Sequence, residues 1–125
     1  MSKGRILIVE DNMDTYELVR FILEKSGYET FLAMNGRDGV NAASKQMPDL
    51  IIMDLSMPEM DGWTATRLIK GNAQTASIPL IALTAHVLPG DRQRAIAAGC
   101  DDYIPKPMDL PELVQTVEEW IRRGV

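Results

Sequence analysis

The chain has 125 residues, of which 46% are hydrophobic and 25% charged, and these proportions suit one soluble globular domain. Its 13 Lys and Arg against 18 Asp and Glu give a formal net charge of -5, which argues against direct nucleic-acid binding, and no apolar run is long enough to span a membrane. A single cysteine, Cys100, excludes an internal disulfide, and because the N-terminus shows no signal-peptide pattern, the sequence predicts a reducing cytoplasmic location.

Strand-like and helix-like patterns alternate along the first half of the chain. Residues 6–9 form a short apolar run with branched side chains, typical of a parallel strand covered on both faces. A helical pattern follows and is expected to end with Gly27 as its C-cap. Its apolar stripe consists of Leu18, Val19, Ile22 and Leu23. Residues 28–33 mix polar with apolar positions, which favours an edge strand, and a weaker helix should follow Asn35.

The second half of the chain repeats the alternation. Residues 50–53 and 80–83 are continuous apolar runs and predict central strands. Asp102–Pro105 is very short and ends in proline, so it predicts an edge strand. The helices expected here follow Asp61, Pro89 and Asp109, the last of these as an N-cap. The stripe of the final helix consists of Leu110, Leu113, Val114, Val117 and Ile121.

Five alternations of strand and helix predict an α/β fold with a five-stranded parallel sheet and right-handed crossovers. Placing the three buried runs inside and the two mixed runs at the edges gives the strand order 2-1-3-4-5, the doubly wound, flavodoxin-like order. In that order the chain reverses direction between strands one and three. Ligands bind beyond the carboxyl ends of the strands at such a switch point.

Polar residues follow four of the predicted strands. Any one of them alone carries little weight, because polar residues commonly end strands, but four convergent ends predict a site. These residues are Glu10 and Asp11, Asp54, Thr84, and Lys106. Three neighbouring carboxylates repel each other unless a cation neutralises them. Mg²⁺ suits this set best, because it prefers oxygen ligands and is usually held by carboxylates together with a phosphate oxygen.

The same set of residues predicts chemistry at Asp54. A carboxylate in an apolar setting beside a metal ion can attack a phosphoryl group and form an aspartyl phosphate. Lys106 would supply positive charge to the phosphoryl oxygens, and the Thr84 hydroxyl would donate a hydrogen bond to them.

The chain resembles the receiver domains of two-component response regulators over nearly its whole length, and the resemblance rests on four segments. The segments are ILIVEDN at 6–12, PDLIIMDLSMPEMDG at 48–62, IPLIALTA at 78–85 and GCDDYIPKP at 99–107. The resemblance is to the single-domain, chemotaxis-receiver-like kind, so one receiver domain over residues 1–125 is expected, with no output domain.

The resemblance implies a role for each residue at the strand ends. Asp54 would accept the phosphoryl group from a sensor histidine kinase or a phosphotransfer protein. Glu10 and Asp11 would hold Mg²⁺ together with Asp54, and Ser56 would add its backbone carbonyl. The peptide bond between Lys106 and the proline after it is expected to be cis, as in similar receivers.

The resemblance also implies a switch. Thr84 would move toward the phosphoryl group and Tyr103 would turn inward, changing a surface formed by the fourth helix, fifth strand and fifth helix. The simpler interpretation of Tyr103 is an edge-strand aromatic packed on the core. The output would pass to a separate effector protein, with the receiver either a monomer or a homodimer that forms on phosphorylation.

Three further residues receive interpretations from their positions. Cys100 is expected to be a small buried residue and not a redox sensor, and Gly62 is expected to serve backbone geometry. His86, the one histidine, is expected to lie in a loop near the site. There it and Ser56 would govern how easily water reaches the acyl phosphate, and so the lifetime of the phosphoryl group.

Three rival functions remain to be weighed. A flavodoxin-like cofactor binder is disfavoured, because its first loop should attract a phosphate and residues 10–14, EDNMD, would repel one. A Mg²⁺-dependent phosphohydrolase with an aspartyl nucleophile would carry a second aspartate where Ser56 stands. A degenerate receiver would act only as a protein-interaction module. The favoured function is a phosphorelay signalling protein that catalyses its own phosphoryl transfer and loss, and not a metabolic enzyme.

Overall fold

The computed structural model describes residues 2–55, 62–84 and 90–123. Five parallel strands form one sheet in the order β2-β1-β3-β4-β5, as the sequence predicts. Their bounds are Arg5–Val9 for β1, Glu29–Ala33 for β2, Leu50–Asp54 for β3, Leu80–Thr84 for β4 and Asp102–Pro105 for β5. The two mixed runs form the edge strands, which are partly exposed, while β3 and β4 are buried throughout.

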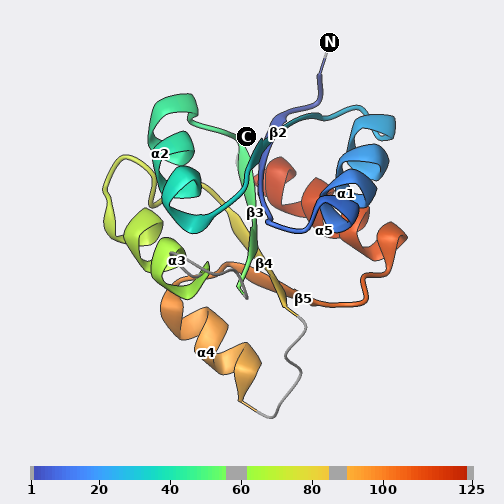
Figure 1. Ribbon diagram of the computed structural model, residues 1–125. Helices are drawn as coiled ribbons and strands as arrows, with labels where there is room; N and C mark the ends of the chain where they lie inside the picture. The colour runs from blue at the N-terminus through green and yellow to red at the C-terminus, as the bar shows by residue number, and fades with distance from the viewer. Residues whose placement is uncertain (1, 56–61, 85–89, 124–125) are drawn as a thin grey trace.

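The described residues form five helices, which cover the two faces of the sheet, with α1 and α5 on one face and α2, α3 and α4 on the other (Figure 1). Their bounds are Met13–Lys25 for α1, Gly36–Gln46 for α2, Gly62–Gly71 for α3, Asp91–Ala98 for α4 and Leu110–Arg123 for α5. Each of the five helices predicted from the sequence is therefore present. Asp109 caps α5 as expected, because its Oδ1 accepts a hydrogen bond from the Glu112 amide at 3.1 Å.

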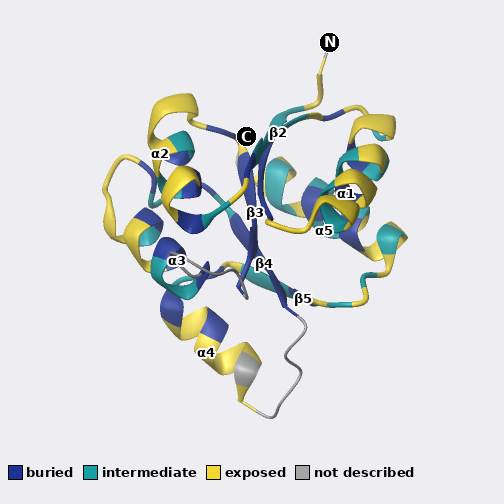
Figure 2. Cartoon of the chain, in the orientation of Figure 1, coloured by how far each residue is buried: buried dark blue, intermediate teal, exposed yellow. Residues whose placement is uncertain are grey.

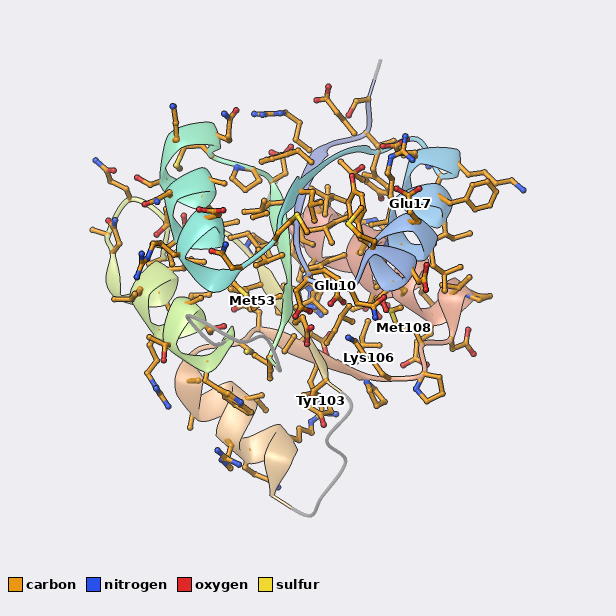
Figure 3. The ribbon with its side chains drawn as sticks, in the orientation of Figure 1. Glu10, Glu17, Met53, Tyr103, Lys106 and Met108 are labelled. Atoms are coloured by element: carbon orange, nitrogen blue, oxygen red, sulfur yellow. The ribbon has the colours of Figure 1, made fainter. Side chains whose placement is uncertain are left out.

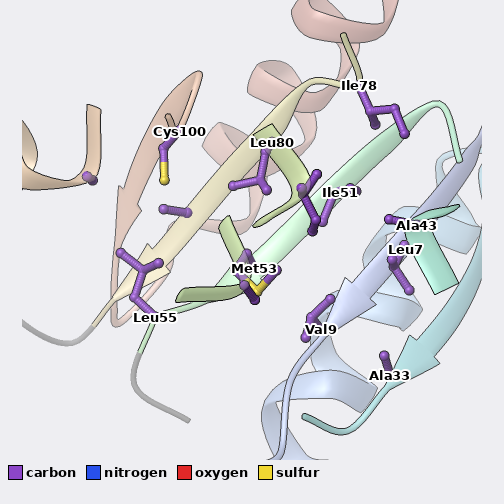
Figure 4. Packing of buried hydrophobic residues seen from close by; sticks show 14 residues of the cluster. Leu7, Val9, Ala33, Ala43, Ile51, Met53, Leu55, Ile78, Leu80 and Cys100 are labelled. Atoms are coloured by element: carbon purple, nitrogen blue, oxygen red, sulfur yellow. The ribbon is translucent and has the colours of Figure 1, made fainter. Parts of the chain in front are cut away.

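The continuous apolar runs supply both faces of the sheet with core residues. Successive side chains of a strand point to opposite faces, so each central strand contributes to two clusters. In β3, for example, Ile51 and Met53 join the cluster under α2, α3 and α4, whereas Leu50 and Ile52 join the cluster under α1 and α5. Figure 2 shows the central strands buried, and Figure 4 shows the first of these clusters.

Helix α1 departs from its predicted stripe at one position. Val19 and Leu23 are fully buried, but Leu18 is 46% exposed. Each residue turns an α-helix by about 100°, and Leu18 lies on the far side of Val19 from Leu23, so its side chain points away from the core. The expected helix end also shifts by one residue, because Ser26 is the C-cap and Gly27 follows it with φ +103°.

None of the helices in the described part of the chain has both the length and the apolar character that crossing a membrane requires.

Two leucines allow a direct test of the core. Leu7 in β1 is fully buried, whereas Leu68 in α3 is 47% exposed. We expect Leu7→Ala to lower the free energy of unfolding by about 2–5 kcal/mol, because it removes buried apolar atoms and leaves a cavity. The matched Leu68→Ala change should stay within about 0.5 kcal/mol of the parent protein. Urea denaturation followed by circular dichroism measures both, and equal losses would contradict the described core.

Candidate functional site

The carboxyl ends of four strands bring the predicted site residues to one edge of the sheet. Glu10 directly follows β1, Asp54 is the last residue of β3, and Thr84 is the last residue of β4. Lys106 directly follows β5 and is held there because its amide donates to the Thr84 carbonyl at 2.7 Å. Figure 3 shows Glu10 and Lys106 lying near each other in the same region of the molecule.

The acidic side chains form one compact cluster. One carboxylate oxygen from each of Glu10, Asp11 and Asp54 lies within 4.8 Å of the other two. Glu10 is 1% exposed and Asp54 is 3% exposed, whereas Asp11 is exposed. The cluster therefore has two buried members and one that faces solvent.

Lys106 is the cation that faces this cluster. Its Nζ lies 3.1 Å from Glu10 Oε1, to which it donates a hydrogen bond, and 3.6 Å from Asp54 Oδ2. The peptide bond between Lys106 and Pro107 is cis, as expected. When both buried carboxylates are ionised, they carry two negative charges against the one positive charge of Lys106 among the described residues.

Burial and the neighbouring Asp54 alter the ionisation of Glu10. Burial is the largest cause, and a hydrogen bond to Asp54 and the charge of Asp54 add to it, so the pKa of Glu10 rises from 4.5 to about 7 although Lys106 acts to lower it. The Asn12 amide also contacts Glu10, donating to Oε2 at 3.3 Å. Sequence reasoning did not assign this contact, because a backbone donor leaves no signal in the residue type.

Gly62, the first residue of α3, packs against the backbone of Asp54. A Cβ atom at Gly62 would overlap the Asp54 carbonyl oxygen and would lie 2.5 Å from the Leu55 Cα. Only a residue without a side chain allows the start of α3 to approach the end of β3 this closely. The expected backbone role of Gly62 is therefore confirmed, and its physical basis is close packing.

The remaining predicted residues divide into two groups. Thr84 is 1% exposed at the end of β4, and Tyr103 in β5 is half-buried against the cluster under α3 and α4. The inward movement expected of both stays a prediction. Ser56 and His86 lie outside the described residues.

Cys100 behaves as a buried filler. It is 5% exposed, and burial raises the pKa of its thiol to about 11. A thiol that stays protonated is a poor nucleophile. The expectation that Cys100 packs in the core is confirmed.

The donor atoms of the cluster fit a hard divalent cation. All three acidic side chains offer oxygen, and the described residues around them offer no thiolate or imidazole. Mg²⁺ prefers such ligands and keeps several water molecules, which the exposed side at Asp11 allows.

Comparison with known proteins agrees with this geometry. Residues 6–118 match the model of the response regulator receiver domain, so the chain belongs to this family of two-component signalling modules. Among curated proteins, it is 38% identical over 116 residues to the polar-differentiation response regulator DivK of Brucella anthropi, covering 93% of this chain and 94% of DivK.

Solved structures of receivers share the fold. The receiver domain of a signal transduction histidine kinase from Syntrophus aciditrophicus is 42% identical with a TM-score of 0.89, covering 96% of this chain and 91% of that one. The receiver domain of a Pseudomonas aeruginosa sensor histidine kinase is 38% identical with a TM-score of 0.88, covering 95% and 98% respectively. The latter structure has a magnesium ion coordinated in its active-site cleft.

Gly62 and Gly71, at the two ends of α3, make a matched pair for mutation. A Cβ atom added at Gly71 would meet no described neighbour within 4 Å, whereas one added at Gly62 meets the backbone of β3. We expect Gly62→Ala to cost about 1–3 kcal/mol of unfolding free energy through overpacking. Gly71→Ala should be neutral or stabilising by up to about 1 kcal/mol. Chemical denaturation measures both, and a neutral Gly62→Ala would refute the close approach.

The raised pKa of Glu10 predicts how stability depends on pH. The folded state binds this proton up to about pH 7, but the unfolded state releases it near pH 4.5, so folding stability falls as pH rises between these values. In buffer with EDTA, the parent protein should lose up to about 3 kcal/mol relative to Glu10→Gln across this window. Denaturation series at several pH values measure the difference. Parallel curves for the two proteins would contradict the assignment.

Proposed function

We propose that this receiver takes up a phosphoryl group on Asp54 from a sensor histidine kinase or a phosphotransfer protein, with Mg²⁺ as cofactor. The arrangement of Asp54 supports this most directly. It is buried, belongs to an acidic cluster that opens to solvent at Asp11, and lies 3.6 Å from the Lys106 ammonium. The Asp54 carboxylate is thus held at a fixed position beside a positive charge, as a nucleophile for phosphoryl transfer requires.

The positions of the side chains support the following transfer step. An oxygen of Asp54 forms a bond to phosphorus while the phosphorus–nitrogen bond of the donor histidine breaks, and the histidine nitrogen keeps the electron pair and takes up a proton. Mg²⁺ would be held by Glu10, Asp11, Asp54 and the backbone carbonyl of Ser56. There it would neutralise the negative charge of the phosphoryl oxygens. Lys106 adds its charge from the β5 side of the site.

Hydrolysis of the aspartyl phosphate returns the protein to its unphosphorylated state. Water attacks the phosphorus, the bond to Asp54 breaks, and the carboxylate and inorganic phosphate are released. We assign Ser56 and His86 the role of modulating the access of this water, and so the lifetime of the phosphoryl group. Both steps act on the protein's own aspartate, so it turns over no metabolite and works as a signalling module.

The output would pass through Thr84 and Tyr103. The Thr84 hydroxyl would donate to the phosphoryl oxygens, which offer new acceptor atoms and negative charge. Tyr103 would turn inward from its half-buried position and so change the surface of α4, β5 and α5. That surface is where a separate effector protein would bind, with the receiver acting as a monomer or a phosphorylation-dependent homodimer.

The family match covers most of this chain and supports a receiver domain as its signalling part. The match spans residues 6–118, and the chain aligns with 94% of DivK from Brucella anthropi. A cytoplasmic location suits a protein that exchanges phosphoryl groups with a kinase, and a net charge of -5 disfavours a direct nucleic-acid target.

Labelling at Asp54 tests the proposal. With a small phosphodonor such as acetyl phosphate and Mg²⁺, intact-mass spectrometry should show one added phosphoryl group on the parent protein and none on Asp54→Asn. Asp14→Asn, which alters an exposed acid in the first turn of α1, should label fully. Chelating Mg²⁺ with EDTA should slow labelling at least tenfold, because the phosphoryl charge is then not neutralised.

Other outcomes identify the rival functions. Continuous release of phosphate from the donor without a stable adduct would indicate an aspartyl-nucleophile phosphohydrolase. No labelling of the parent protein by any donor would indicate a degenerate receiver that works only as a protein-interaction module.

A further inference from the structure

Helix α4 is attached to the rest of the protein through a small apolar contact. Among its described side chains, the buried ones are Ala95 and Ala98, while Ile96 is 52% exposed. Figure 2 shows most of the helix exposed. Hydrophobic stabilisation grows with the apolar area buried, so two methyl groups hold this helix less firmly than the buried leucines and valines hold α1 and α5.

The C-terminal end of α4 is anchored by polar contacts. Gly99, with φ +112°, ends the helix and packs on the stem of Lys70 from α3. The Lys70 ammonium donates to Asp101 Oδ2 at 2.6 Å, to the Ile78 carbonyl at 2.7 Å and to the Ala76 carbonyl at 3.1 Å. These bonds fix the turn between α4 and β5, so a shift of α4 has to occur at its opposite end.

Arg94, in the N-terminal half of α4, makes a contact with α3. Its guanidinium lies over the ring of Trp63 at 4.9 Å from the centroid, which joins α4 to the first turn of α3. A cation–π contact at an exposed site changes an equilibrium constant by about two- to fivefold. For a helix that buries two alanines, a contact of this size is a substantial part of its attachment.

Trp63 also stands next to the site. It directly follows Gly62, which lies so close to the Asp54 carbonyl that a Cβ atom there would overlap its oxygen. Any displacement of the backbone at Asp54 therefore pushes on the start of α3 and moves the Trp63 ring. Because a cation–π contact needs the cation over the ring face, such a movement weakens the hold on Arg94.

We propose that the Trp63–Arg94 contact is a clamp that holds α4 in the position described here, and that phosphorylation of Asp54 favours an arrangement with the clamp open. Trp63 and Arg94 are then positioning residues for the switch, acting through α4. This proposal rests on the proposed function, since it takes Asp54 as the phosphoryl acceptor. Sequence reasoning did not find the pair, because the two residues lie on different helices and neither belongs to the acidic site.

Linkage gives the clamp a measurable consequence. If binding at Asp54 has to open the clamp, part of the binding free energy is used to break the Trp63–Arg94 contact. A variant without this contact should therefore bind a phosphoryl analogue more tightly, by the factor that the contact contributes to the equilibrium constant. Arg94→Gln removes the cation and keeps a polar side chain. Arg92→Gln makes the same change two residues away, at an exposed position of the same helix.

Two measurements test the clamp. Titration calorimetry with beryllofluoride and Mg²⁺ should give about two- to fivefold tighter binding for Arg94→Gln than for the parent protein, and unchanged binding for Arg92→Gln. Without the analogue, amide hydrogen exchange in residues 91–98 should be faster by a similar factor in Arg94→Gln and unchanged in Arg92→Gln. Trp63→Leu should reproduce both effects, and Trp63→Phe, which keeps an aromatic face, should fall between it and the parent protein.

The outcomes separate this proposal from the proposed function. Unchanged or weaker analogue binding by Arg94→Gln, with normal binding by the parent protein, would overturn the clamp. Unchanged exchange in α4 would overturn it as well. If the parent protein itself failed to bind the analogue, the proposed function would fail, and the exchange comparison would still decide whether Arg94 holds α4.

Discussion

The repulsion between two buried carboxylates is the constraint around which this receiver is built. Glu10 and Asp54 are removed from water at the end of the sheet, and only Lys106 is close enough among the described residues to offset their charge. Burial and, after it, the neighbouring Asp54 raise the pKa of Glu10, and Lys106 lowers it only in part. A site with surplus negative charge is prepared for a divalent cation, because binding the ion relieves the repulsion.

The rest of the fold keeps these charges in place. Glu10 follows β1 and Asp54 ends β3, and these two strands are adjacent in the sheet and packed on both faces. The two carboxylates therefore cannot move away from each other without disturbing the core. Gly62 closes the arrangement from the α3 side by lying against the Asp54 carbonyl. The close packing around Asp54 contrasts with the small buried contact of α4, so a small change at the chemical centre can act on a nearby element that moves at small cost.

Family membership and the geometry of the side chains give different information about this protein. The match over residues 6–118 identifies a receiver, but it says nothing about which contacts hold this particular α4. The Trp63–Arg94 pair and the Lys70 bonds come from the described side chains alone. Receivers with a common acidic site can differ in contacts of this kind, and therefore in how far and how readily they switch.

The sequence by itself determined the strand order and the identity of the site. Continuous apolar runs such as residues 50–53 require cover on both faces, and in a parallel sheet all carboxyl ends meet at one edge, so Glu10, Asp54 and Lys106 had to converge. Only the tertiary structure decided that Leu18 faces solvent, that the Asn12 amide reaches Glu10, and that Trp63 meets Arg94. These features depend on the rotation and packing of whole helices, which the periodicity of a single segment does not specify.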